Sequence, residues 1–477
     1  MTFLSLAPVF PELLLAIGAL VLLLVGAFGG DRSASGITDF SVAMLAGVAV
    51  IAGASSFAVS DTLTAFGGGY LADSLAGVFK ILVLLSASVA LLMARGWMQQ
   101  AGSFRPEYPV LVMLSVLGMM VMLSAGNLLV LYIGLELQSL VLYVLAAFRR
   151  DNSRSSEAAL KYFVLGGLAS GFLLYGISLV YGATGSIAFS DVPVSGHVPL
   201  TGMAFILAAL LFKISAVPFH MWAPDVYEGA PTPVTAFFSV APKLAAFGLL
   251  LRLLYGPFAG LMAEWQDILM VVSAATMLVG SLAAIGQTNI KRLMAYSSVG
   301  HVGFALMGMA SGTETGLTAV ILYLVFYIVM SLGAFSVILL MQRDGEALEN
   351  ISDLSGVARV HPGLAAAMAM LMFSMAGIPP LVGFFTKLSI FMAVLNSGLV
   401  WLAIVGAVAS VIGAFYYLRI IKVMYFDEPE GGFDLPLDPS LAMTAVATSV
   451  LTLAGVGLLG NLVSVAHYAL HVLPLAP

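Results

Sequence analysis

The sequence predicts an all-α integral membrane protein of about 14 transmembrane helices, arranged mainly as two inverted five-helix repeats. Three observations lead to this prediction. Of the 477 residues, 61% are hydrophobic and 9% are charged, whereas a soluble domain has about 25% charged residues. Apolar stretches of about 20 residues, the length that spans a bilayer, follow one another along the chain. Lysine and arginine concentrate in alternate connections between these stretches.

The apolar stretches give the expected helix positions. The first stretch is not preceded by basic residues, so it does not resemble a cleaved signal peptide and is expected to remain as a helix. The connections have at most roughly twenty residues, which excludes a catalytic domain outside the membrane. The expected spans are 8–28, 38–60, 73–95, 109–126, 127–148, 157–182, 198–222, 231–255, 264–286, 291–311, 314–342, 362–396, 398–424 and 439–471.

The distribution of basic residues predicts the orientation, because cytoplasmic connections collect lysine and arginine. The even-numbered connections have at most Arg252, near the end of the eighth span. This alternation supports the number of spans and places both termini on the outer side. The odd-numbered connections contain Arg32, Arg95, Arg105, Arg149, Arg150, Arg154, Lys291, Arg292, Arg343, Arg359, Arg419 and Lys422.

The composition also excludes several classes of function. The chain has 18 basic and 24 acidic residues, a formal net charge of −6, which argues against a nucleic-acid partner or anionic lipids recruited by bulk charge. It has no cysteine, so disulfides, thiolate metal sites, iron–sulfur ligands and a cysteine nucleophile are excluded.

Proline interrupts the seventh and twelfth spans, which occupy the fourth position in spans 4–8 and 9–13. Interrupted helices at matching positions of two halves are typical of the binding sites of inverted-repeat transporters. An odd number of helices in each half reverses its orientation, so the predicted repeat is inverted. The expected units are a three-helix segment 1–108, a first repeat 109–256, a second repeat 257–426 and a C-terminal helix 427–477.

The remaining basic residues are lysines inside the apolar spans. A charged side chain at the centre of a transmembrane helix costs about 2.5–3.5 kcal/mol, which a purely structural helix bundle has no reason to carry. The alternative is that the side chain extends to the membrane surface, an interpretation most suited to Lys80 and Lys161 near their helix starts. These lysines are Lys80, Lys161, Lys213, Lys243 and Lys387.

Glu136 is an acidic residue in the fifth span. Tyr132, Glu136, Ser139 and Tyr143 follow at intervals of four, three and four residues and therefore share one helical face. Intramembrane acids are usually functional. The alternative is a protonated carboxyl group that hydrogen-bonds across helices.

Two lysines flank the proline-rich region between the seventh and eighth spans. Lys213 precedes Pro218, and irregular backbone at this depth must be buried in protein or line a water-filled cavity. His220 shares a face with Lys213 only if the helix continues past Pro218. In the eighth span, a polar stripe leads from Thr232 to Lys243.

His301 lies in the middle of the tenth span, one turn after Ser297. A neutral imidazole both accepts and donates a proton, which suits a relay; the alternative is a core histidine bonded to a neighbouring helix. A haem with His220 and His301 as axial ligands is disfavoured because neither residue has a local haem signature. In the twelfth span, Lys387 follows the break at Pro379 and Pro380.

Four segments carry a family resemblance. They are GLELQSLVLYVLAAF around Glu136, PFHMWAPDVYEGAPTPVTAFFSVAPK from Pro218 to Lys243, NIKRLMAYSSVGHVGF around His301 and GIPPLVGFFTK ending at Lys387. With them the chain resembles the antiporter-like subunits of respiratory complex I, the proton-pumping NADH:quinone oxidoreductase. The lysine at position 387 distinguishes it from subunit M, which would have a glutamate there. Subunit L would continue into a long lateral helix and further spans, whereas this sequence stops at Pro477.

The resemblance implies two half-channels for protons. In the first, Glu136 and Lys213 would form a charge pair, with Lys161 as a nearby modulator. Opening and closing this pair would make Lys213 release or hold its proton.

The remaining candidates would extend this path. Lys243 and His301 would form the central relay, and His220 would be a polar member of the water chain. Lys387 would be the exit-side residue of the second half-channel.

The resemblance also implies partners and location. The neighbours would be antiporter-like and small membrane subunits of complex I, in a bacterial cytoplasmic (inner) membrane with both termini periplasmic; the other contacts would be lipid and protons, with no nucleic acid. The sequence has no quinone, flavin or nucleotide motif, so flavin, iron–sulfur clusters and quinone are expected in partner subunits, and this chain would be a non-redox translocase subunit without a cofactor or metal.

Two alternative functions remain open. One is a subunit of a multisubunit Na⁺/H⁺ antiporter without a redox partner, whose members share the EG…PTPV turn. The other is a scaffold whose charges only hold helices together, which predicts assembly defects on mutation and no specific effect on pumping.

Overall fold

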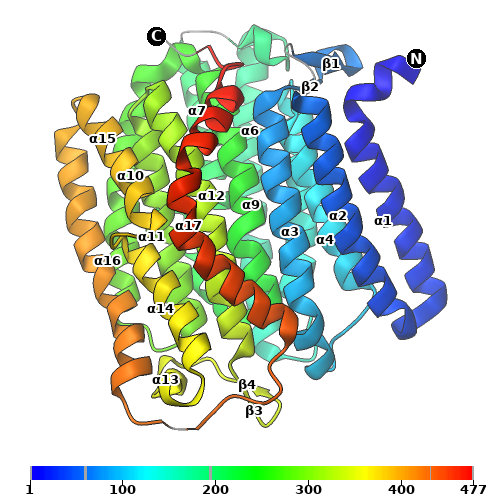
Figure 1. Ribbon diagram of the computed structural model, residues 1–477. Coiled ribbons are helices and arrows are strands. Elements are labelled where there is room, and N and C mark those ends of the chain that lie inside the picture. Colours follow the sequence, from blue (N-terminus) through cyan, green and yellow to red (C-terminus); the bar gives the residue numbers. More distant parts are fainter. Residues whose placement is uncertain (1–2, 58–61, 193–195, 430, 475–477) are drawn as a thin grey trace.

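The protein is a bundle of long helices in a computed structural model that describes residues 3–57, 62–192, 196–429 and 431–474 (Figure 1). Helices α1 (Phe10–Gly29), α2 (Ala34–Phe57) and α3 (Ser74–Gln100) lie at one edge. A short 3-10 helix, Phe3–Val9, precedes α1, and the antiparallel strands β1 (Leu63–Ala65) and β2 (Tyr70–Ala72) lie between α2 and α3. The expected end of the second span, residue 60, lies outside the described residues.

The middle of the chain forms the next group of helices. Its central member is α9, which is buried at every position because other helices surround it. The group consists of α4 (Glu107–Leu123), α5 (Leu128–Ala146), α6 (Ser153–Thr184), α7 (His197–Lys213), α8 (Trp222–Gly229) and α9 (Thr232–Tyr255).

The last part of the chain completes the bundle, with α15 and α16 at the edge opposite α1 (Figure 1). A two-stranded hairpin, β3 (Gln342–Arg343) and β4 (Glu346–Ala347), follows α12. The helices are α10 (Met262–Ile285), α11 (Ile290–Ala310), α12 (Glu314–Leu340), α13 (Val357–Val360), α14 (Pro362–Ala376), α15 (Val382–Asn396), α16 (Val400–Phe426) and α17 (Pro439–Leu470).

The predicted all-α membrane fold is confirmed. Among the described residues, 10 helical stretches are long and apolar enough to cross a membrane, and one of them, Leu6–Phe57, contains both α1 and α2. The helices α4, α7, α14 and α15 are apolar but shorter. The number of about 14 spans stays a prediction, since shorter and interrupted helices are not separately established as spans.

The two interrupted helices are broken where proline predicted it. α7 ends at Lys213, and the backbone turns at Ser215, whose φ is 63°. α14 ends at Ala376 and is capped by Gly377, which adopts a left-handed conformation with φ of 84°. A glycine tolerates this conformation without steric cost, and the following prolines cannot continue the helical hydrogen-bond ladder.

Both ends of the described chain lie at the same end of the bundle (Figure 1). The hairpin β3–β4, α13 and the connection between α16 and α17 lie at the opposite end, which also carries the basic connections expected to be cytoplasmic. This arrangement agrees with an even number of crossings; the direction of the chain in the membrane stays a prediction.

Lys80 does not extend to the membrane surface, because its ammonium group has partners inside the protein. Its ammonium group lies 2.6 Å from the carboxylate of Glu12 on α1 and donates a hydrogen bond of 2.8 Å to the hydroxyl of Tyr70. Both charged side chains are buried. The pair therefore ties α1 to α3 inside the protein.

A second buried ion pair joins α3 to the middle of the chain. Arg252 of α9 donates to both carboxylate oxygens of Asp73, at 2.7 and 2.8 Å, and to the carbonyl oxygen of Leu123 at 2.9 Å. Arg252, assigned from the sequence to a connection, is therefore a buried residue that holds three helices together.

Candidate functional site

The first part of the site lies between α5, α6 and α7. Lys213 is the last residue of α7, where the helix dipole favours a positive charge. Its ammonium group donates to the hydroxyl of Ser139 at 2.7 Å and of Tyr143 at 3.4 Å. Glu136, one turn before Ser139, accepts a hydrogen bond from Ser170 of α6.

The expected direct pair between Glu136 and Lys213 is therefore not formed in this structure. The shared face of α5 does bring Glu136, Ser139 and Tyr143 to the same side, as the spacing predicted, but Ser139 holds the lysine while Glu136 turns to α6. Lys213 is buried and Glu136 is half-buried, and each has a neutral hydrogen-bond partner in place of the other.

The second part of the site surrounds Lys243, which is 2% exposed. Its ammonium group donates to the hydroxyl of Ser298 on α11, and the ring of Tyr227 on α8 lies 5.3 Å away. The hydroxyl of Ser298 in turn lies 2.7 Å from the hydroxyl of Tyr327 on α12. Side chains from three other helices thus surround this lysine of α9.

His301 on α11 is bonded on both sides of its ring. Nδ1 lies 2.5 Å from the hydroxyl of Tyr323 on α12, and Nε2 lies 3.0 Å from the hydroxyl of Tyr417 on α16. Lys243, His301 and Tyr323 line a common cavity of about 10 Å³.

The third part of the site is the break between α14 and α15. Lys387 lies on α15, but its ammonium group reaches back to the carbonyl oxygens of Met375 (2.9 Å) and Ala376 (3.1 Å) at the end of α14. The ring of Phe304 lies 5.0 Å from it. Although one lysine precedes its proline break and the other follows it, Lys213 and Lys387 both place their charge at the C-terminal end of a half-helix.

His220 and Lys161 do not join these lysines directly. The helix does not persist past Lys213, so the face that His220 was expected to share with Lys213 does not exist. His220 is half-buried, and its Nδ1 contacts no hydrogen-bonding partner within the described part of the chain.

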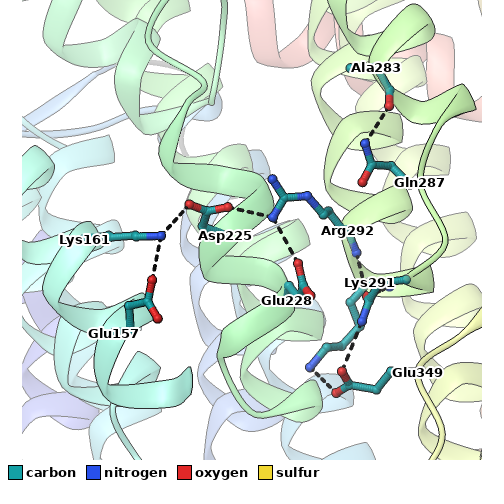
Figure 2. Close-up of polar contacts among 10 residues, drawn as sticks. Glu157, Lys161, Asp225, Glu228, Ala283, Gln287, Lys291, Arg292 and Glu349 are labelled. Atoms are coloured by element: carbon teal, nitrogen blue, oxygen red, sulfur yellow. Dashed lines mark hydrogen bonds and ion pairs between the residues drawn. The ribbon is translucent and has the colours of Figure 1, made fainter. Parts of the chain in front are cut away.

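Lys161 belongs to a cluster of charges at the ends of α6, α8 and α11 (Figure 2). Its ammonium group lies 2.9 Å from Glu157 and 2.8 Å from Asp225, and its side chain is 43% exposed. Arg292 contacts Asp225 at 2.6 Å and Glu228 at 3.0 Å. Partial burial raises the pKa of the Asp225 carboxyl, but hydrogen bonds and charges from Lys161 and Arg292 hold the pKa below its usual value.

The chemical groups gathered at the site are suited to proton transfer. Among the residues that the structure describes, no group of three or more His, Asp or Glu side chains is placed to hold a metal ion. The buried groups are ammonium, imidazole, carboxyl and hydroxyl, which exchange protons.

The sequence interpretation named Ser139 and Tyr143, which hold Lys213, but it missed the hydroxyl groups that contact Lys243 and His301. Tyr323 and Tyr327, four residues apart in an apolar helix, share one face and carried a signal of the same kind as that of Tyr132 and Glu136. Ser298 and Tyr417 carried no comparable pattern, because single polar residues in an apolar helix do not reveal their partners.

The comparisons with known proteins begin with a family model described as "NADH:quinone oxidoreductase/Mrp antiporter, TM", which matches residues 125–413. Curated relatives are similar over nearly their whole length. NADH-quinone oxidoreductase subunit N of Methylobacterium nodulans is 51% identical, over 94% of this chain and 93% of its own. The protein of the same name from Paramagnetospirillum magneticum is 49% identical, over 98% of both chains.

Solved structures share the fold. A chain of respiratory complex I from Thermus thermophilus is 33% identical with a TM-score of 0.82, over 95% of this chain and 98% of that one. A chain of the Mrp complex from Dietzia is 26% identical with a TM-score of 0.86, over 98% and 97%. The TM-scores do not separate the two kinds of complex, whereas the curated relatives favour subunit N.

Gly383 allows α15 to begin directly against the end of α14, one turn before Lys387. A Cβ atom at Gly383 would lie 1.9 Å from the carbonyl oxygen of Ser374. We therefore expect Gly383→Ala to destabilise the protein by about 1–3 kcal/mol through overpacking and to lower the temperature at which it unfolds in detergent. Gly363→Ala, where a Cβ meets nothing within 4 Å, is the matched control. Equal unfolding temperatures for both variants would contradict this packing constraint.

Proposed function

The chain belongs to the NADH:quinone oxidoreductase/Mrp antiporter family of membrane subunits, and from this membership and its buried ionisable groups we propose that it translocates protons as subunit N of complex I. It would be a non-redox subunit of NADH:quinone oxidoreductase. Its work would be to move protons while other subunits reduce quinone.

One observation carries this proposal. Lys213, Lys243 and Lys387 are 5%, 2% and 7% exposed, and each ammonium group is held by hydroxyl or carbonyl oxygens and not by a carboxylate ion. A lysine held by neutral oxygens can give up its proton without leaving a buried anion behind, whereas a lysine in a tight ion pair cannot. These three lysines are therefore suited to exchange protons.

The proposed path begins at Glu136 and Lys213. A charge pair at about 4 Å is worth about 4 kcal/mol at an effective dielectric constant of 20, and moving one charge across 100 mV costs about 2.3 kcal/mol. If Glu136 leaves Ser170 and pairs with Lys213, the lysine holds its proton; when the pair opens, as in this structure, the proton can pass towards Lys243. The change in energy is sufficient to work against a membrane potential.

The path would continue through the centre to the second break. Lys243 and His301 would exchange a proton across the cavity between them, assisted by Tyr323. Lys387 would release it on the far side, and His220 would contact the water chain that leads into the first half-channel.

The surroundings follow from the same proposal. The partners would be antiporter-like and small membrane subunits, and flavin, iron–sulfur clusters and quinone would lie in other subunits. The chain would cross the bacterial cytoplasmic (inner) membrane with both termini on the periplasmic side.

A second candidate is a subunit of a Mrp-type cation/proton antiporter, because a chain of the Mrp complex shares the fold with a TM-score of 0.86. The sequence identity of about 50% to subunit N proteins over nearly the full length favours the first candidate.

Lys213→Ala and Glu136→Ala are each expected to abolish proton pumping or to reduce it strongly, because the first half-channel loses one of its two charges. The measurement is acidification of vesicles that contain the reconstituted complex, together with its quinone reductase rate. Lys422→Ala removes an exposed lysine and serves as the control. Assembled Lys213→Ala and Glu136→Ala complexes that pump normally would remove both residues from the mechanism.

Purification of the native membrane complex tests the choice between the two candidates. We expect the chain to purify with flavin, iron–sulfur centres and NADH:quinone reductase activity that quinone-site inhibitors block. A complex without redox centres that exchanges Na⁺ for H⁺ in vesicles would instead establish the antiporter.

The orientation is open to a direct test because the chain has no cysteine. Ser352→Cys, in the connection between α12 and α14, and Ser190→Cys, in the connection between α6 and α7, place single exposed thiols at opposite ends. With a membrane-impermeant maleimide, we expect Ser190→Cys to be labelled in spheroplasts and Ser352→Cys only in inside-out vesicles. The reverse pattern would place the termini in the cytoplasm.

A further inference from the structure

A single carboxylate, that of Asp225, joins three helices at the charged end of the site. Oδ2 contacts Lys161 of α6 at 2.8 Å, and Oδ1 contacts Arg292 of α11 at 2.6 Å. Figure 2 shows Asp225 between these two cations, with Glu228 below as a second acceptor for Arg292. Asp225 therefore ties α8, the second part of the first broken helix, to a helix on either side.

Other contacts hold the two ends of α8. At its start, the indole nitrogen of Trp222 donates to the carbonyl oxygen of Phe212 at 2.9 Å. Just past its end, Lys291 donates to the carbonyl oxygen of Ala230 at 3.2 Å. Along its side, a Cβ at Gly229 would lie 2.7 Å from the Cβ of Ala158 on α6, so α8 and α6 are in close contact.

The inner side of α8 contacts the surroundings of both Lys213 and Lys243. Trp222 bonds to Phe212, the neighbour of Lys213, and stacks on Tyr162 with ring centres 4.4 Å apart. One turn later, the ring of Tyr227 lies 5.3 Å from the ammonium group of Lys243. A shift of α8 would therefore alter the environment of both lysines at once.

Lys161 is poorly placed to act on Lys213 through its own charge. Its ammonium group contacts two carboxylates, Glu157 and Asp225, and its side chain is 43% exposed. Two adjacent anions and access to solvent weaken the field of a cation at longer range. Its strongest connection to the interior is the contact with Asp225.

We propose that Asp225 is a positioning residue that holds α8 in place between Lys213 and Lys243, and that Lys161 influences proton transfer through this carboxylate. The inference rests on the proposed function and refines it, because the family resemblance implied only that Lys161 is a nearby modulator of the charge pair. Arg292 holds the same carboxylate from the side of α11, so the two cations act on one shared group.

A double-mutant cycle on the assembled complex tests the proposal, with protons pumped per NADH oxidised as the readout and the quinone reductase rate beside it. Asp225→Asn and Lys161→Met should each lower this ratio, by about threefold for a network contact of ordinary strength. Lys161→Met should lower it no further when Asp225→Asn is already present. Losses that multiply in the double variant would show that Lys161 acts independently of Asp225 and would overturn the proposal.

Two further variants distinguish an effect of the position of α8 from an effect of the charge near Lys161. Glu157→Gln removes the other carboxylate of Lys161 without touching α8, and the ratio should stay unchanged. Gly229→Ala pushes α8 away from α6 without changing any charge, and it should lower the ratio as Asp225→Asn does. A loss with Glu157→Gln and none with Gly229→Ala would make the effect electrostatic and reject a positioning role.

Hydrogen exchange of the segment 222–229 in the assembled complexes supplies the structural readout. Asp225→Asn should speed exchange there, and Glu157→Gln should not. If Asp225→Asn leaves both the exchange and the ratio unchanged, Asp225 does not position α8. This comparison uses complexes that retain quinone reductase activity, so its failure would contradict only the positioning role of Asp225. The proposed function itself would be contradicted if the wild-type complex did not pump protons.

Discussion

The cost of burying a lysine ammonium group governs how this structure is assembled. Such a charge is tolerated inside a membrane protein only where its protons reach oxygen atoms. For each central lysine, another helix supplies the acceptor oxygen: Ser139 on α5 for Lys213, Ser298 on α11 for Lys243, and the end of α14 for Lys387. The contacts that make the charges tolerable are thus the contacts that bring these helices together, so the site and the packing of the bundle have one physical origin.

The two broken helices solve the same problem in two ways. The final carbonyl groups of a helix have no partner within it, and in an apolar interior they need donors. At the second break, the ammonium group of Lys387 donates hydrogen bonds to these carbonyl oxygens. At the first break, the indole nitrogen of Trp222 donates to the carbonyl oxygen of Phe212, and the adjacent Lys213 donates instead to hydroxyl groups of α5. At each break, the carbonyl groups at the end of a helix and a nearby lysine favour the binding of a proton. This holds whether the lysine precedes the proline in the sequence or follows it.

Hydropathy and proline positions were sufficient to predict an all-α membrane fold and the two helix breaks, because both signals act locally along the chain. The rarity of charge in these spans likewise identified Lys213, Lys243 and Lys387 as buried residues. The partners could not be predicted: Glu12 for Lys80, Ser170 for Glu136 and Tyr417 for His301 each come from another helix. Choosing them requires the rotation of each helix about its axis. A helix such as α9, which is buried on every side, has no lipid- or solvent-facing side that would fix this rotation from the sequence.

The charges around Asp225 differ from the buried lysines in strength, and this difference suggests a division of roles. A pair of partly exposed charges contributes about 0.2–1 kcal/mol, which is less than the roughly 2.3 kcal/mol needed to move one charge across 100 mV. The Asp225 cluster therefore cannot drive a proton. It can bias the position of α8 because several weak contacts act on one helix of eight residues, and this helix contacts the surroundings of both lysines. The energy for transfer would then come from the buried groups, and the charged cluster would set the geometry in which they exchange protons.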